Sequence, residues 1–208
     1  GTASLANDSG IGILNGAAQN IIGGTLAGAG NLVSGNNFIG IQLQGNGSSQ
    51  NMVQGNIVGL DVSGTQALMN LVGIGVNGAQ NNQIGGSTAG SGNLISGNQI
   101  GLTLQSSGAT GNLVMGNLIG TNAVGNTAVP NDYGIQIVLG AHNNTIGGDT
   151  AGAGNLISGN RIVGLAIHGT GSAQNKVWGN RIGTNLNGTA AIGNDVGVAL
   201  LVGATQNE

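Results

Sequence analysis

The acidic side chains are the first candidates for chemistry, because clustered carboxylates hold metal ions and act as general acids and bases. The chain has six of them: Asp8, Asp61, Asp132, Asp149, Asp195 and Glu208. Three of them, Asp8, Asp132 and Asp195, follow an asparagine at one position of a repeat, but Leu71 occupies that position in the second unit. If the repeats are stacked β-coils, carboxylates on alternate coils lie about 10 Å apart. That is too far to share a metal ion, so we predict turn capping and no metal site.

The basic residues and the histidines give no stronger indication of a site. Arg161, Lys176 and Arg181 lie towards the C-terminal end, where a small patch for an acidic glycan or another partner competes with ordinary solvated positions. Three basic residues are too few for a phosphate-neutralising surface, so we expect no nucleic-acid partner. His142 and His168 have no metal-ligand spacing. We predict no catalytic residue, no cofactor and no enzymatic activity.

The composition narrows the class of protein. Of 208 residues, 45 are glycine, one is proline and none is cysteine, and only 4% are charged. A hydrophobic share of 39% with so little charge argues against disorder, and glycine without a three-residue period argues against collagen. No apolar run reaches the 18 residues that a membrane helix needs. The chain therefore reads as a folded protein with no membrane span.

A short motif, x-G-[ILV]-x-[ILV], recurs along the whole chain, and the elements that it forms must position the remaining residues. Its apolar residues alternate with small or polar ones, which is typical of a half-buried strand. The glycines of its seven copies are Gly10, Gly40, Gly73, Gly101, Gly134, Gly164 and Gly197. Near-constant spacing indicates repetition of one structural unit.

A larger unit of 62 residues divides into two coils of about 31. The triplet I-G-G begins at Ile22, Ile84 and Ile146, 62 residues apart both times. Two asparagine series mark two further short strands of the form N-x-[IV] in each coil. The first is Asn20, Asn51, Asn82, Asn112, Asn144, Asn175 and Asn207, and the second is Asn31, Asn56, Asn93, Asn117, Asn155 and Asn180.

Three strands per coil predict an all-β protein, a right-handed parallel β-helix of about seven coils paired into 62-residue super-repeats. Abundant glycine and asparagine argue against helices. We expect asparagine amides to stack at the bends and two kinds of glycine-rich insert to form loops at two corners. One interior stack should consist of Ile22, Val53, Ile84, Val114, Ile146 and Val177.

The pattern N-x-I-x-x-N-x-I followed by N-x-x-G-I-x-L resembles the right-handed parallel β-helix repeat family, the pectate-lyase-like superfamily. It is matched by 51–53, 56–58 and 70–76, and again along the chain. The longer pattern N-x-I-G-G-x-T-A-G-A-G-N-x-I-S-G-N resembles arrays in large bacterial secreted and surface proteins. The resemblance implies the fold, which hosts polysaccharide lyases, adhesins, phage tailspikes and structural arrays.

These observations favour a structural role. Residues 1–208 are expected to form a single β-helix, a fragment or ordered part of a longer repeat protein, in an extracellular, cell-surface or filament-forming bacterial protein. Its expected partners are further β-helix coils stacked end to end, from the same chain or another subunit. The alternative is a carbohydrate-binding or polysaccharide-processing β-helix whose active groove lies outside this segment.

One outer stripe is a candidate for lateral contact, including lateral self-association. In the second asparagine series, the residue that follows asparagine should point outward, and it is usually large and apolar. With outward residues of the first series, the stripe comprises Leu32, Ile57, Leu94, Leu118, Leu156, Met52, Leu113, Met115 and Trp178. A continuous apolar stripe is unusual on a free surface. The chain's own inserts could cover it, a partner could, or a one-residue slip could turn it inward.

Overall fold

The computed structural model describes residues 6–208 and contains only β-strands in that range, nineteen of them, arranged in three parallel sheets. Residues 1–5 of the predicted domain lie outside the described residues. Sheet A contains β1 (Ser9–Leu14), β4 (Ile39–Gln44), β7 (Val72–Asn77), β10 (Ile100–Gln105), β13 (Tyr133–Val138), β16 (Val163–Ile167) and β19 (Val196–Leu200).

The other two sheets consist of strands of two or three residues. Sheet B contains β2 (Ile21–Gly23), β5 (Met52–Gln54), β8 (Gln83–Gly85), β11 (Leu113–Met115), β14 (Thr145–Gly147) and β17 (Lys176–Trp178). Sheet C contains β3 (Leu32–Val33), β6 (Ile57–Val58), β9 (Leu94–Ile95), β12 (Leu118–Ile119), β15 (Leu156–Ile157) and β18 (Arg181–Ile182).

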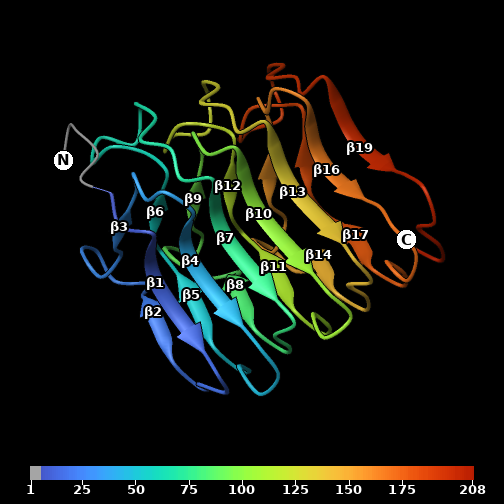
Figure 1. Cartoon of the computed structure of the whole chain (residues 1–208). Helices are drawn as coiled ribbons and strands as arrows, with labels where there is room; N and C mark the ends of the chain where they lie inside the picture. The colour runs from blue at the N-terminus through green and yellow to red at the C-terminus, as the bar shows by residue number, and fades with distance from the viewer. Residues whose placement is uncertain (1–5) are drawn as a thin grey trace.

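The chain winds as a right-handed coil that visits sheets A, B and C in turn, so each strand pairs with the strand three places later. The described ends lie at opposite ends of a rod (Figure 1). Six turns are complete, and β19 adds a seventh strand to sheet A. The predicted parallel β-helix is confirmed.

The core is a set of in-register stacks between the three sheets. On sheet B, Ile22 pairs with Val53, Val53 with Ile84, and so on to Val177. The four inner members of this stack are fully buried, and Ile22 and Val177 pack against them at the two ends. The predicted register of the interior stack is confirmed.

Asparagine ladders join the coils at three corners. The two expected series form hydrogen-bonded ladders, and a third runs through Asn7, Asn36, Asn70, Asn98, Asn131, Asn160 and Asn194. Asn117 shows the arrangement: its Oδ1 accepts from the backbone N and the Nδ2 of Asn93, and its Nδ2 donates to Asn155 Oδ1 and to the carbonyl of Ile84. Each ladder side chain between the two ends of the rod therefore links three successive coils.

The repeated glycine of sheet A is required by close packing between coils. A β-carbon on Gly101 would lie 2.6 Å from the carbonyl oxygen of Gly134 and 3.0 Å from Asn131 Nδ2. Its φ is not in the left-handed region, so the close approach alone excludes a side chain. Glycine at this position lets the ladder and the strand come together.

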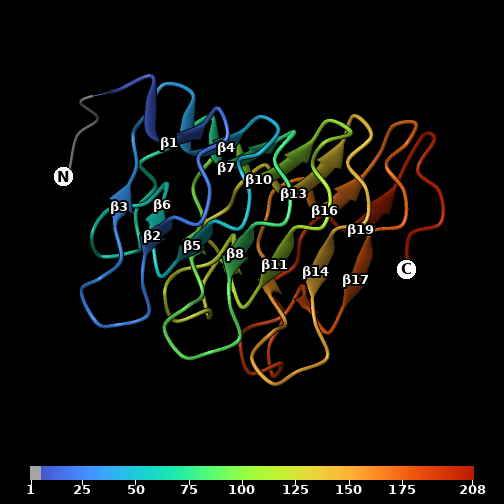
Figure 2. The same cartoon turned by 90° about the horizontal axis from the view of Figure 1, so that it is seen from below.

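The two kinds of insert form rows of loops along the rod. Residues 24–30, 86–92 and 148–154 connect sheets B and C, and Figure 2 shows them as the blue, green and orange loops at the bottom. Residues 60–69, 121–130 and 184–193 connect sheets C and A, along the top of Figure 1. Each of the latter closes with an antiparallel bridge, such as that between Leu60 and Ala67. The inserts therefore occupy fixed positions on the outside of the rod.

Candidate contact surfaces

The predicted stripe on sheet C is not a continuous exposed surface. Leu94 and Leu156 are 6% and 2% exposed, whereas Leu32 is 41% exposed and Ile57 and Leu118 are half-buried. Leu94 and Leu156 are therefore not open to a lateral partner, and for them the expected alternative of cover by the chain's own inserts applies. Their outward position is not in doubt, because Val58, Ile95 and the other inward residues fill the core beneath them.

The chain's own inserts cover these leucines. A β-carbon on Gly64 would lie 3.1 Å from Leu94 Cδ2, and one on Gly125 would lie 3.0 Å from Leu156 Cδ2. Leu94 forms a small outer cluster with Leu60 and Val129, both buried, and the half-buried Ile57 and Leu118 pack against it. The second insert of each super-repeat thus makes an outer apolar layer over the following coil.

Successive inserts also contact each other two coils apart. The position of a β-carbon on Gly64 is 3.3 Å from Ala123 Cβ, and the backbone N of Leu186 donates to the carbonyl of Gly125 at 2.8 Å. The inserts therefore form their own row, parallel to the rod.

The members of the stripe on sheet B stay partly open but do not join those on sheet C. Met52 and Met115 are half-buried, while Leu113 and Trp178 are 39% and 44% exposed. The ammonium of Lys176 lies 5.4 Å from the centre of the Trp178 ring, a cation–π distance. Met52 and Leu113, two coils apart, line one hollow together with Gln83 of the coil between them.

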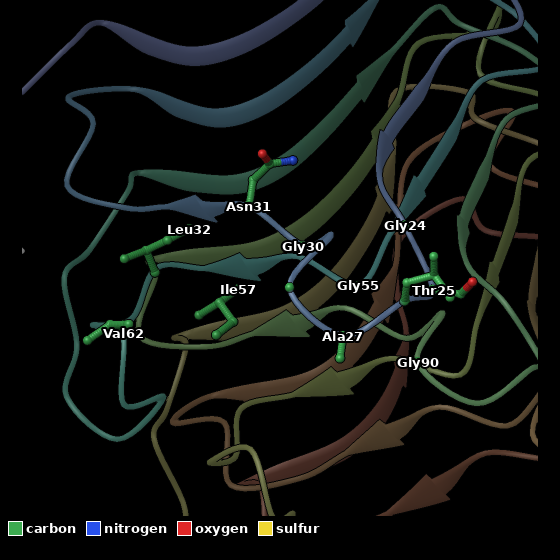
Figure 3. Close-up of a pocket in the computed structure, with 12 residues that line it drawn as sticks. Gly24, Thr25, Ala27, Gly30, Asn31, Leu32, Gly55, Ile57, Val62 and Gly90 are labelled. Carbon is green, nitrogen blue, oxygen red and sulfur yellow. The ribbon is translucent and has the colours of Figure 1, made fainter.

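An apolar hollow of about 510 Å³ opens at the N-terminal end of sheet C. Figure 3 shows Leu32, Ile57 and Val62 gathered on one side of it, with Ala27 and Thr25 of the first insert on the other. Its lining contains no ionisable side chain. The hollow suits an apolar contact and offers no group for acid–base chemistry.

A second apolar row, absent from the predicted stripe, lies on the outer face of sheet A. The residues before the repeated glycines pair in register: Ser9, Ile39, Val72, Ile100, Tyr133, Val163 and Val196. Two of them, Ile39 and Val72, flank the outward position of Gly75 at 3.6 and 3.8 Å from its would-be β-carbon. The sequence indicates this row at the first residue of the motif x-G-[ILV]-x-[ILV], because that residue is apolar in six of the seven copies.

Exposed apolar neighbours widen this row. Phe38, Leu71 and Ile162, each one position earlier in the chain, are 53%, 41% and 40% exposed. Leu71 therefore extends this apolar row at the position where three other coils carry Asp8, Asp132 and Asp195. The outer face of sheet A therefore carries exposed apolar side chains that the predicted stripe did not include.

Two of the basic residues are paired. Arg161 donates to Asp132, and Lys176 Nζ lies 3.7 Å from Glu208 Oε2. At the position equivalent to Asp132, Asp8 Oδ1 accepts from Asn37 Nδ2 at 3.2 Å. Asp8 and Asp132 therefore bond to the next coil, and the predicted capping of their own turn is not observed.

Asp61 does cap a turn. Its Oδ1 accepts from the backbone N of Thr65 and of Gln66, both at 3.1 Å, and Ser63 Oγ donates to the same carboxylate. The Gln66 N–H, followed by the Ser63 hydroxyl, lowers the pKa of Asp61. Asn122 accepts equivalent backbone bonds in the next insert of this kind, so the position requires an acceptor rather than a charge.

Within residues 6–208, no three or more His, Asp or Glu side chains come together as a metal site would require. His142 Nδ1 lies 3.0 Å from the carbonyl of Gly140, two residues earlier in its own loop. No helix suited to crossing a membrane occurs in the described part of the chain. The described surface therefore offers apolar contact area, and two of its three basic side chains are already paired with carboxylates.

No protein-family model, no curated protein and no solved structure matches this chain.

Proposed function

We propose that this chain is a structural rod: a β-helical module of an extracellular, cell-surface or filament-forming bacterial protein, without enzymatic activity. The observation that supports it is the continuity of the three asparagine ladders, which run from the first described coil to the last. A catalytic β-helix needs a place where the repeat is interrupted to install chemistry.

Stiffness is the property that this arrangement supplies. Every coil is joined to the next by parallel sheets on three faces and by side-chain ladders at three corners. In a repeat protein, each unit contacts only its neighbours, so uniform interfaces give uniform resistance to bending along the axis. The resemblance to arrays of bacterial secreted and surface proteins supports the extracellular setting.

End-to-end stacking of further coils is the contact that we propose for the module. On β19, Val198 and Leu200 are 43% and 58% exposed, whereas the corresponding Leu165 and Ile167 of β16 are fully buried. Another coil, from the same chain or from another subunit, would bury both side chains and pair the free strand edge. Unpaired edges of this kind template further strands.

Two measurements on the 208-residue chain test the proposal. A panel of neutral and acidic polysaccharides is screened for cleavage and for saturable binding, with heat-denatured protein as the control. Self-association is followed by sedimentation and electron microscopy, for the native chain and for Leu200→Lys. We expect neither cleavage nor saturable binding, and end-to-end particles that Leu200→Lys suppresses. Cleavage or tight binding of a glycan would instead support a carbohydrate-active module.

A further inference from the structure

Four Asn-Gly dipeptides occur in the chain, and each is a place where asparagine can react with its own backbone. They are Asn15-Gly16, Asn46-Gly47, Asn77-Gly78 and Asn187-Gly188. In this reaction the backbone N of the glycine attacks the side-chain amide carbon of the asparagine, and glycine has no side chain to obstruct the approach. Asparagine is among the thermolabile residues for this reason. The four dipeptides are alike in sequence, so any difference between them comes from the fold.

Three of the four attacking nitrogens are occupied by hydrogen bonds. Gly16 N donates to Ser48 Oγ at 3.1 Å, on the next coil. Gly78 N donates to the carbonyl of Gln105 at 3.0 Å, and Gly188 N donates to the carbonyl of Asn185 at 2.9 Å. An N–H held by an acceptor must first release it before the nitrogen can attack, and the loss of one hydrogen bond corresponds to a factor of about ten in population.

Asn46-Gly47 differs from the other three. Like Asn15-Gly16, whose turn Ala17 N closes on the carbonyl of Leu14, it occupies the two central positions of a turn, here closed by Ser48 N donating to the carbonyl of Gly45 at 3.1 Å, but no residue of the next coil binds its glycine N–H. Such a turn uses the N–H of its fourth residue and leaves that of its third free. Across residues 6–208, neither Gly47 N nor the Asn46 side chain has a hydrogen-bond partner, and Asn46 is exposed. Gly47 adopts a φ of 87°, which glycine tolerates without strain.

We propose that Asn46 is a site of spontaneous deamidation in the folded protein. Gly47 N forms a bond to Asn46 Cγ, the Cγ–Nδ2 bond breaks, and the amide nitrogen leaves as ammonia with the proton of the Gly47 N–H. The resulting succinimide is opened by water at either carbonyl, which yields aspartate or isoaspartate. One water is consumed, one ammonia is released, and no oxidant is needed. The product carries one more negative charge, so the formal net charge changes from -3 to -4.

The native chain and its unfolded form provide the test. Both are incubated at mildly alkaline pH, the latter in guanidinium chloride, and each Asn-Gly site is followed by peptide mapping with isoaspartate detection. In the folded protein we expect Asn46 to convert about ten times faster than Asn15, Asn77 and Asn187, the factor set by one hydrogen bond. In denaturant the four rates should converge. The proposal is overturned if any other Asn-Gly site matches or exceeds Asn46 in the folded chain.

Two substitutions test the reaction at Asn46 and its control by hydrogen bonding separately. The chain itself contains both replacement residues at equivalent turns. Asn46→Thr reproduces the turn 169–172, where Thr170 precedes Gly171, Ser172 N closes the same bond and Gly171 has a φ of 83°. It should abolish the reaction and leave the fold unchanged by circular dichroism.

Ser48→Ala places alanine where the turn 106–109 has Ala109, and it frees Gly16 N. Deamidation of Asn15 should then rise about tenfold while that of Asn46 stays constant. An unchanged rate at Asn15 in a folded Ser48→Ala variant would show that the hydrogen bond does not control the reaction. The wild-type comparison decides the main point even if this variant is unstable.

Discussion

The buried asparagines are stable in the interior because all of their polar atoms are used. An unpartnered buried amide costs free energy, so such residues are normally on the surface. Asn117 is fully buried, yet its Nδ2 donates to Asn155 Oδ1 and to the Ile84 carbonyl, and its Oδ1 accepts two bonds from Asn93. No described buried side-chain nitrogen or oxygen lacks a partner.

Replacing a ladder asparagine by aspartate should therefore be far more harmful than the same change on the surface. Asn117→Asp removes both donors and places a carboxylate opposite the Asn155 and Ile84 oxygens, so we expect a loss of about 3–5 kcal/mol in unfolding free energy. The matched control is Asn122→Asp, at the half-buried capping position where the preceding super-repeat carries Asp61. Chemical denaturation of both variants gives the comparison. Equal losses of unfolding free energy would mean that the buried ladder is no more sensitive to this change than the capping position.

At the scale of the strand, the repeated motif serves two faces of sheet A at once. Its glycine faces the asparagine ladder and the next coil, as Gly101 does against Gly134 and Asn131. Two residues further on, the outward position tolerates several types, including Gly75, Thr103 and Gln136 in register. Two glycines in equivalent strands can thus have opposite tolerance for a side chain.

A pair of alanine substitutions tests this difference. Gly101→Ala puts a methyl group 2.6 Å from a backbone oxygen, which cannot move without shifting the next coil, and should cost about 1–3 kcal/mol. Gly75→Ala meets its nearest atoms at 3.6 Å, an ordinary contact. It should be neutral or stabilise by about 0.4–1 kcal/mol, because alanine restricts the unfolded chain. Thermal unfolding measures both; similar losses would place the strain elsewhere.

For the whole molecule, the inserts determine which part of the rod's surface is open. They cover Leu94 and Leu156 on sheet C, while Phe38 and Ile162 beside the apolar row of sheet A stay exposed. The outer layer is built from segments two coils apart that touch through Gly125 and Leu186. Its integrity therefore depends on the stacking of the entire solenoid.

Charge introduced beneath this layer should weaken the fold. Leu94→Glu buries a carboxylate under the insert, and we expect a loss of about 2–4 kcal/mol with faster proteolysis of residues 60–69. Leu32→Glu, at the equivalent but open position in the hollow of Figure 3, should change stability by less than about 0.5 kcal/mol. Urea unfolding and limited proteolysis distinguish the two. If Leu94→Glu leaves stability intact but abolishes self-association, this position contacts a partner and the inserts do not protect it.

The coil, its period and its interior could be predicted from the residue pattern alone. Alternation with a period of two and the 62-residue spacing place Val53, Ile84 and Val114 on one face of successive strands, because only that register buries them together. Asparagine at fixed intervals likewise predicted two of the ladders. These features follow from the alternation within each strand and from the constant spacing between repeats, both of which can be read along the chain.

Which outward side chains are covered could not be predicted in this way, because it depends on contacts between different coils. Leu32 and Leu94 occupy the same repeat position, but an insert about 30 residues away in the chain lies on one of them. Asn15 and Asn46 both precede glycine, but a hydroxyl on the next coil occupies the nitrogen beside only the first. The repeated sequence specifies how each coil is built. The exposure and reactivity of a side chain depend on which residues of other coils contact it, and a single repeat does not specify those residues.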